Sequence, residues 1–185
     1  MALFRRREDP HALAVRMTGS QMGEHVLMVG SGDGGRSAAI AAPVGLSGRA
    51  VAVVFDQASA DRVSRGADSA GVLLEVMPVS SVSLPVEDGI FHLAVIDDTT
   101  GLFSSLRAED RVLLVREVLR ALRPGGRIMV LGTGVRGGLG ALLSRAQSGT
   151  PYDPLPLLAA DGFKAGRRLA EAEGLVFFEA VKPRS

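Results

Sequence analysis

A run of glycines near the start of the chain separates an apolar segment from a helix-forming one. It reads Gly30-Ser31-Gly32-Asp33-Gly34-Gly35, after the apolar residues 25–29 and before the stretch 36–44. Glycine permits tight turns and lets a ligand approach the backbone closely, and a helix N-terminus presents free N–H groups. The segment therefore indicates either a turn that cradles a nucleotide-like ligand or a tight strand-to-helix turn without a ligand.

The same loop satisfies two ligand-binding patterns, and its spacing alone does not separate them. Gly30, Gly32 and Gly35 give G-x-G-x-x-G, the dinucleotide pattern. Gly30, Gly32 and Gly34 give G-x-G-x-G, the S-adenosylmethionine (SAM) pattern. A second copy of the first spacing, at 132–137, has too little chain behind it for two more strand–helix units. With 23 glycines in the chain, each pattern alone is a weak signal.

Two adjacent carboxylates follow a later apolar run. Asp97 and Asp98 come directly after residues 90–96, where a carboxylate could act as a base toward a hydroxyl or an amine. Helix capping or a polar strand end is the alternative role for both side chains. Neighbouring residues on a strand point to opposite faces, so spacing alone does not make them an acid–base pair.

Other polar residues are weaker candidates. Tyr152, the only tyrosine, lies in a proline-flanked loop that could cover a pocket, while Arg136 and Arg145 could face an acidic substrate. Surface packing and solvated positions explain these three residues as well. His92 lies near the start of the predicted strand 90–96, which favours a structural role.

Composition excludes several kinds of chemistry. The chain has no cysteine and three well-separated histidines, so we expect no disulfide, thiol nucleophile or metal centre. Lys+Arg number 21 against 20 Asp+Glu, and aromatic residues make up 4% with no tryptophan, which argues against nucleic-acid binding. No apolar run is long enough to span a membrane and no signal-peptide pattern is present, so we expect a cytoplasmic protein without membrane contact.

Apolar runs alternate with helical stretches along the chain, which predicts strand–helix–strand units and a parallel sheet. A tail with a short helix (1–20) should precede a single α/β domain (21–185). A hairpin is expected at the C-terminal end, although residues 163–174 also suit a helix. The predicted strands are 25–29, 49–55, 72–76, 90–96, 127–131, 163–170 and 175–182, and the predicted helices are 11–18, 36–44, 57–70, 109–122, 141–147 and 155–160.

Further segments resemble the class I SAM-dependent methyltransferases, especially the small-molecule group that includes ubiquinone- and menaquinone-biosynthesis methyltransferases (methyltransferase type 11). The resemblance extends over about residues 20–182. It implies SAM as cofactor and a three-layer α/β/α Rossmann-like fold, with a mostly parallel seven-stranded sheet that ends in an antiparallel hairpin. The segments that carry it are Gly23-Glu-His-Val-Leu-Met-Val-Gly30, Val44-Gly-Leu-Ser-Gly-Arg49, Leu84-Pro-Val-Glu-Asp-Gly-Ile-Phe91, Leu122-Arg-Pro-Gly-Gly-Arg127 and the terminal Gly162-Phe163.

The chain departs from this family at three cofactor-binding positions. The resemblance places Met28, Val54 and Ser80 where the family has carboxylates that accept hydrogen bonds from the cofactor. Asp56 would restore one contact if the second strand were two residues longer, and helix capping is its alternative role. Each lost charged contact costs about 1.5–3 kcal/mol, so losing three would weaken binding by several orders of magnitude.

The sequence therefore predicts a SAM-dependent methyltransferase for a small-molecule substrate, with a weakened cofactor site and no assigned catalytic residue. The alternative is a non-catalytic relative that binds a protein partner. The sequence does not predict the oligomeric state, and an oligomer is one option. A NAD-type oxidoreductase is the third reading, and the Leu-Arg-Pro-Gly-Gly turn and terminal hairpin disfavour it. No metal site is predicted. The expected cofactor-binding residues are Met28, Gly30, Ser31, Gly32, Asp33, Gly34, Val54, Phe55, Asp56, Ser80, Ser81 and Asp97.

Overall fold

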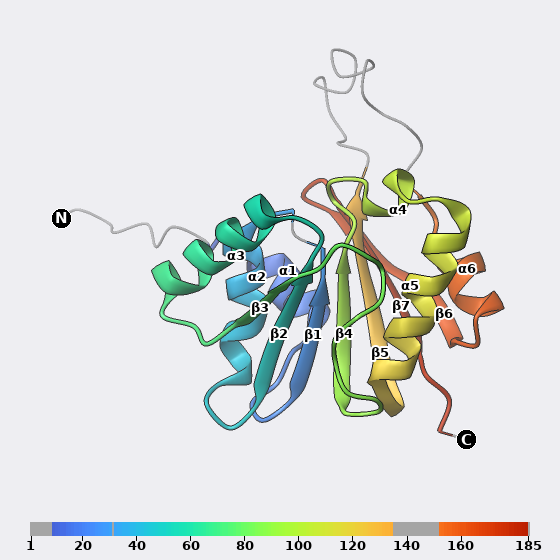
Figure 1. The fold of residues 1–185 in the computed structure, drawn as a ribbon, viewed down its shortest axis with the longest axis horizontal. Helices are drawn as coiled ribbons and strands as arrows, with labels where there is room; N and C mark the ends of the chain where they lie inside the picture. The colour runs from blue at the N-terminus through green and yellow to red at the C-terminus, as the bar shows by residue number, and fades with distance from the viewer. Residues whose placement is uncertain (1–8, 31, 135–151, 185) are drawn as a thin grey trace, which may run out of the picture.

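Helices cover both faces of one central sheet (Figure 1). The computed structural model describes residues 9–30, 32–134 and 152–184. In these ranges the sheet has seven strands in the order β3-β2-β1-β4-β5-β7-β6. The strands are β1 (His25–Val29), β2 (Arg49–Val54), β3 (Glu75–Pro78), β4 (Phe91–Asp97), β5 (Leu122–Thr133), β6 (Lys164–Ala172) and β7 (Leu175–Val181). The helices are α1 (Ala12–Thr18), α2 (Gly34–Ala41), the 3-10 helix η1 (Ala42–Val44), α3 (Gln57–Ala70), α4 (Leu102–Ser105), α5 (Ala108–Ala121) and α6 (Leu155–Ala160).

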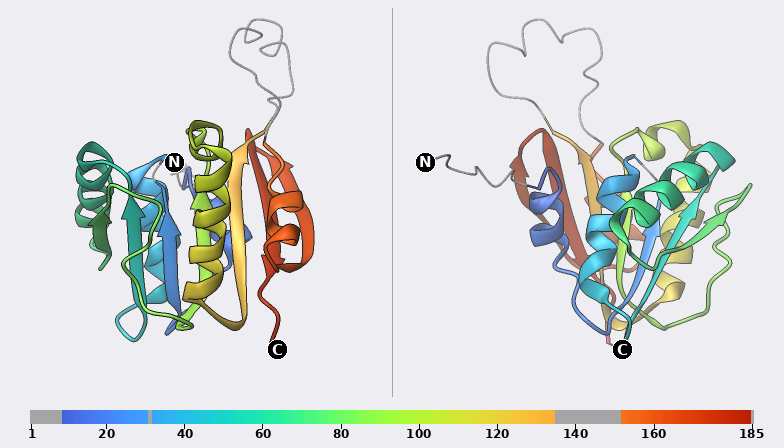
Figure 2. Two further views of the ribbon diagram at one scale, coloured as in Figure 1. Left: turned by 45° about the vertical axis from the view of Figure 1, so that its right-hand side comes forward. Right: turned by 90° about the vertical axis from the view of Figure 1, so that its left-hand side faces the viewer.

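Helices lie on both faces of the sheet (Figure 2), and alternation of side chains along the central strands builds a separate core on each face. Val26 and Met28 of β1 pack with residues of α1, α2 and α3 on one face. Leu27 and Val29 pack with residues of α4, α5 and α6 on the other face. Because successive side chains of a strand point to opposite faces, a strand buried on both faces reads as the continuous apolar run seen in the sequence. The predicted three-layer α/β/α fold is confirmed.

The order of the strands defines one place where a ligand is expected. Strand β1 pairs in parallel with β2 on one side and with β4 on the other. The chain runs outward from β1 to β2 and β3, and then returns to start β4 on the opposite side of β1. Ligands of open α/β sheets bind outside the carboxyl ends of the strands at such a reversal. The carboxyl ends of β1 and β4 are therefore the place to search.

The C-terminal segment is a hairpin, as predicted, and the helix alternative for 163–174 is wrong. Strand β7 pairs antiparallel with β5 and with β6, so it lies between them. Phe177 and Phe178 explain why the hairpin forms, because they are buried on opposite faces of β7. Burial of two large aromatic side chains outweighs the helix propensity of the preceding residues.

Three predicted elements differ from the structure by three or more residues at one end, and the others within the described residues differ by two residues or fewer. Strand β3 covers Glu75–Pro78 and not 72–76, because the N–H of Val72 still bonds to the carbonyl of Ala67 and closes α3. Strand β5 begins at Leu122, with a register shift across the Pro-Gly-Gly turn. The predicted helix 36–44 starts two residues earlier and ends as η1.

One helix of the described structure was not predicted, namely the short α4. The helix predicted for 141–147 lies outside the described residues. Among the residues that are described, no helix is both long and apolar enough to cross a membrane.

Candidate functional site

The glycine loop lies at the reversal of the sheet, directly after β1. Gly30 has a φ of 82°, a conformation that favours glycine, and its N–H donates to the carbonyl of Val53 at 2.9 Å. This turn leads the chain away from β1 and toward the end of β4. There the N–H of Gly32 donates to Oδ2 of Asp97, the last residue of β4, at 3.2 Å. Loop and strand end therefore meet where the topology predicts a ligand.

Asp97 is the centre of a hydrogen-bond cluster at this point. Its Oδ1 accepts from the N–H of Thr99 at 3.0 Å and from Oγ1 of Thr99 at 2.5 Å. Its Oδ2 accepts from Gly32 and from Nη1 of Arg36 at 2.9 Å. The same Nη1 also donates to Oγ1 of Thr99 at 2.9 Å. Both carboxylate oxygens thus hold two donors each.

Arg36 comes from α2, in its first turn and directly beyond the glycine loop. Its side chain is only 14% exposed, and that of Asp97 is 10% exposed. The two groups form an ion pair that is largely shielded from water. Such a pair gains little net stability over apolar packing, but removal of one partner leaves an uncompensated buried charge.

The absence of a side chain at Gly32 keeps this cluster together. A Cβ at this position would overlap Oγ1 of Thr99 and would lie 3.0 Å from each carboxylate oxygen of Asp97. The loop backbone therefore lies directly against the end of β4. The glycine spacing seen in the sequence has a local reason here, namely close approach of the backbone to a carboxylate.

Asp98 serves a different purpose from its neighbour. Its Oδ1 accepts from the N–H of Phe103 at 2.7 Å and so fixes the first turn of α4. Burial raises the pKa of Asp98 to about 6, and the charge of Asp97 adds to the rise, while the hydrogen bond from Phe103 opposes it. The two carboxyl groups point to different partners, as alternation along a strand predicts.

Two other predicted acids cap helices. Asp33 is the N-cap residue of α2 and accepts from the N–H of Gly35 at 2.9 Å. Asp56 is the N-cap residue of α3, and it accepts from the N–H and the hydroxyl of Ser59, both at 2.7 Å. These hydrogen bonds lower the pKa of Asp56, with the hydroxyl bond the larger cause. Strand β2 ends at Val54, so the longer second strand that would bring Asp56 to the site is absent.

The remaining predicted cofactor residues are apolar or exposed. Met28 and Val54 are buried in the core beneath α1, α2 and α3, and Phe55 packs against the other core. Ser80 and Ser81 are exposed, in the loop where the N–H of Val79 donates to the carbonyl of Val54. Gly34 is buried, and Ser31 lies outside the described residues. At the three positions where the resemblance implies carboxylates, the chain has two buried apolar side chains and one exposed hydroxyl.

The weaker candidates have structural roles or lie outside the described part of the chain. Tyr152 stacks on Phe103, with ring centroids 5.1 Å apart, and Arg111 lies 5.5 Å from its ring. Nδ1 of His92 accepts from the N–H of His25 at 3.1 Å. Arg136 and Arg145 are not described. Within the described ranges, no group of three metal-binding side chains comes together.

Sequence reasoning missed three residues of the site. Arg36 and Thr99 complete the Asp97 cluster, and Nε2 of His11 lies 3.8 Å from Oδ2 of Asp33. The signals were faint: an arginine just beyond the glycines, a threonine two places after a strand-end acid, and a histidine before α1. No local pattern shows that residues as distant as Arg36 and Asp97 meet.

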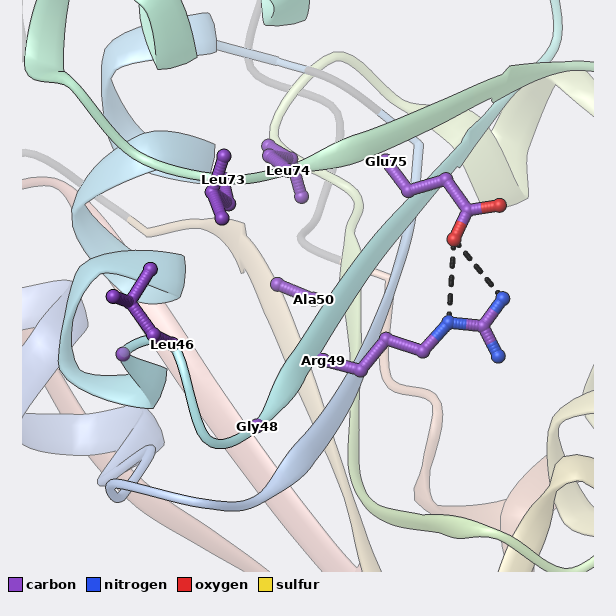
Figure 3. Close-up of a pocket in the computed structure, with 8 residues that line it drawn as sticks. Leu46, Gly48, Arg49, Ala50, Leu73, Leu74 and Glu75 are labelled. Atoms are coloured by element: carbon purple, nitrogen blue, oxygen red, sulfur yellow. Dashed lines mark hydrogen bonds and ion pairs between the residues drawn. The ribbon is translucent and has the colours of Figure 1, made fainter.

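A groove lies at the amino ends of β2 and β3, at the opposite ends of the strands from the Asp97 cluster. It has a volume of about 290 Å³ and lies between the loops that precede these strands. Leu46 and Leu73 line it and are 88% and 74% exposed. In Figure 3 the side chain of Arg49 points away from Leu46 and Leu73 and toward Glu75, with which it forms an ion pair at 2.9 Å. This groove is remote from the Asp97 cluster because it lies at the other ends of the strands.

Comparison of the sequence with known families identifies one relevant match. A family model described as a methyltransferase domain matches residues 26–126. This span runs from β1 to the turn within β5 and includes the glycine loop and Asp97. Among curated proteins, no sequence relative was found.

Solved structures with similar folds include two SAM-dependent methyltransferases and the protein YcgJ. A SAM-dependent methyltransferase from Aquifex aeolicus is 18% identical, with a TM-score of 0.72 over 94% of this chain and 89% of that chain. YcgJ from Bacillus subtilis is 16% identical, with a TM-score of 0.65 over 95% and 99%. A SAM-dependent O-methyltransferase from Thermotoga maritima is 15% identical, with a TM-score of 0.66 over 94% of this chain and 64% of its own. At these identities the likeness is one of fold.

Proposed function

We propose that this chain, which belongs to the class I SAM-dependent methyltransferase family, binds SAM at the carboxyl ends of β1 and β4 and methylates a small molecule. The observation that carries the proposal is the contact between the glycine loop and Asp97. It brings a close-approach backbone, a helix N-terminus and a shielded carboxylate to the reversal of the sheet. Sites of this kind hold a ligand that has polar groups at one end.

The residues suit the amino-acid end of SAM better than its ribose. Asp97 is a carboxylate acceptor for an ammonium group, and the N–H of Gly32 holds one of its oxygens against the glycine loop. For the ribose, Val54 is apolar and buried, and Asp56 lies two residues beyond the end of β2, where it caps α3. We therefore infer binding with reduced affinity, because the hydroxyls of the ribose lack a charged acceptor.

The chain contributes position more than chemistry to the proposed reaction. When bound, SAM supplies a methyl group on a positively charged sulfur, which is already a strong electrophile. The protein then has to hold a substrate nucleophile in line with that methyl group. In this scheme the Gly30 turn and Asp97 orient the donor. Asp98 holds α4 in place beside the site through its bond to Phe103.

Calorimetric titration with S-adenosylhomocysteine (SAH), the product of methyl transfer, tests the proposal. We expect saturable binding with a Kd on the order of 100 µM and no binding of NAD, the control for the dinucleotide reading. Asp97→Asn should weaken SAH binding about tenfold or more, since the ammonium loses its charged acceptor. Asp56→Ala should leave the affinity unchanged. No heat with millimolar SAH, or a preference for NAD, contradicts the proposal.

The exposed groove favours a second candidate function, a non-catalytic domain that binds a protein partner. Met22, 79% exposed, adds to Leu46 and Leu73 on this surface, since a Cβ at Gly45 would lie 3.8 Å from its Cγ. Apolar side chains gathered on a surface are typical of interaction sites. Absence of SAH binding, together with self-association that Leu46→Glu and Leu73→Glu abolish, would support this candidate over the first.

A further inference from the structure

The ion pair at the candidate site leaves no free acceptor for a ligand. Each oxygen of Asp97 already holds two donors, and Arg36 supplies the only full positive charge among them. An ammonium group that binds Asp97 must therefore take the place of Arg36. Because Arg36 is displaced, the ligand must also supply a partner for Arg36, a requirement that neither residue would impose alone.

The requirement follows from the burial of both side chains. Arg36 and Asp97 are 14% and 10% exposed, so each needs a charged partner in the bound state as well. A ligand with only a positive charge would satisfy Asp97 and leave Arg36 shielded without a partner. A ligand with an ammonium and a carboxylate on the same carbon supplies a partner for each. The pair therefore favours a zwitterion.

The position of Arg36 also suits a carboxylate. It lies in the first turn of α2, where the free N–H groups and the helix dipole favour negative charge. The carboxylate of Asp33 already caps this turn at Gly35, so the ligand would meet Arg36 and not the cap itself. The guanidinium presents further donors in a planar fork that matches a carboxylate.

We propose that Arg36 selects the carboxylate of an α-amino-acid ligand by exchange of ion-pair partners. On binding, the Asp97 carboxylate releases Arg36 and accepts from the ligand ammonium, and Arg36 donates to the ligand carboxylate. No bond forms or breaks, and the charge of the site stays balanced. This inference rests on the proposed function. It goes beyond that function in assigning a selecting role to Arg36 and in ranking ligands by their carboxylate.

Two ligands and two proteins test the exchange in one thermodynamic cycle. The ligands are SAH and its decarboxylated analogue, which keeps the ammonium and lacks the carboxylate. The wild-type protein should bind SAH about tenfold or more tightly than the analogue, as expected for a charged hydrogen bond. In Arg36→Gln this ratio should fall to about one. Arg36→Gln also frees Asp97 from its ion pair, which changes the binding of the ammonium group. Because both ligands carry the ammonium, this effect is the same for both and cancels in the ratio of their affinities.

Matched variants separate the exchange from a general loss of structure. Arg65→Gln removes an exposed arginine of α3 and should leave the ratio at its wild-type value. Arg36→Lys retains the charge without the fork and should give an intermediate ratio. Thermal melting of each variant reports whether it is folded. If Arg36→Gln does not fold, Arg36→Lys still tests the exchange.

The outcomes for the two proposals are distinct. If both ligands bind and Arg36→Gln leaves their ratio unchanged, the exchange is wrong while the proposed function stands. If neither ligand binds wild-type protein at millimolar concentration, the proposed function fails and the exchange fails with it. A ratio that falls in Arg36→Gln and not in Arg65→Gln supports both.

Discussion

At the scale of single residues, two adjacent carboxyl groups do different work because a strand turns them to different sides. Asp97 faces α2 and the glycine loop, with charged and polar donors on both oxygens. Asp98 faces α4, in surroundings apolar enough that burial raises its pKa to about 6. The same residue type thus gives one acceptor for a cation and one helix-fixing group with an unusual affinity for protons.

The raised pKa of Asp98 predicts a dependence of stability on pH. Its pKa is higher in the folded state, at about 6, than the ~3.9 of an unfolded chain, so the folded state holds this proton more tightly. Its contribution to stability is therefore lost as the pH rises between these two values. In Asp98→Asn, whose amide oxygen can still accept from Phe103, this loss should disappear.

Denaturant unfolding of both proteins from about pH 4 to about pH 7 checks this prediction. The free energy of unfolding of Asp98→Asn, minus that of wild type, should rise with pH up to about 6 and then level off. Other acids titrate in both proteins and cancel in the difference. A difference that stays constant over the whole range would show that Asp98 titrates normally.

At the scale of elements, the site depends on how closely α2 approaches α3. A Cβ at Gly66 of α3 would overlap the carbonyl group of Gly34, the first residue of α2, and a Cβ at Gly34 would overlap the carbonyl of Arg62. The two helices therefore touch backbone to backbone. This contact fixes the position of the first turn of α2, and Arg36 in that turn donates to Asp97.

Gly66→Ala should destabilise the protein although alanine is the better helix former. The propensity gain is about 1 kcal/mol, but the added methyl group meets backbone that cannot rotate away. Overpacking of this kind costs about 1–3 kcal/mol and shifts the helices apart. We expect a lower Tm and, because α2 moves, weaker SAH binding.

Thermal melting and titration of the same sample measure both effects. Ser69→Ala, at an exposed position of the same helix, is the control and should leave Tm and affinity close to wild type. A Tm that rises in Gly66→Ala would mean that helix propensity outweighs the contact, and the close packing of α2 on α3 would then not hold.

At the scale of the whole molecule, the sequence predicts the architecture well because the fold depends on apolar periodicity. Residues 26–29 and 50–54 are buried, and the type and order of these strands follow from where the apolar runs lie along the sequence. The predicted bounds of a strand are wrong where its pairing with a strand distant in the sequence determines them. Strand β3 is set by its register with β2, in which Glu75 pairs with Val51, and no local signal indicates that register.

The candidate site is predicted less completely, for a related reason. The glycine loop and Asp97 follow from position, since both come directly after apolar runs. The partner of Asp97 does not, because Arg36 precedes it by 61 residues and meets it only after the sheet has formed. The capping role of Asp56 was an open alternative, and the end of β2 at Val54 decides for the cap.

The two ends of the parallel strands give the molecule two distinct surfaces. The Asp97 cluster lies at the carboxyl ends of β1 and β4, and the groove with Leu46 and Leu73 lies where β2 and β3 begin. The central claim is that the SAM-type ligand binds at the first surface. A measurement that reports the place of binding tests this claim more directly than affinity does.

That measurement is a titration of isotopically labelled protein with SAH, followed through the backbone amide shifts. At 19.3 kDa the chain is small enough for residue-by-residue assignment. We predict that the largest shifts occur at Gly30, Gly32 and Thr99, and that the amides of Leu46 and Leu73 do not move. Shifts confined to the groove, or no shifts at millimolar SAH, would contradict the account.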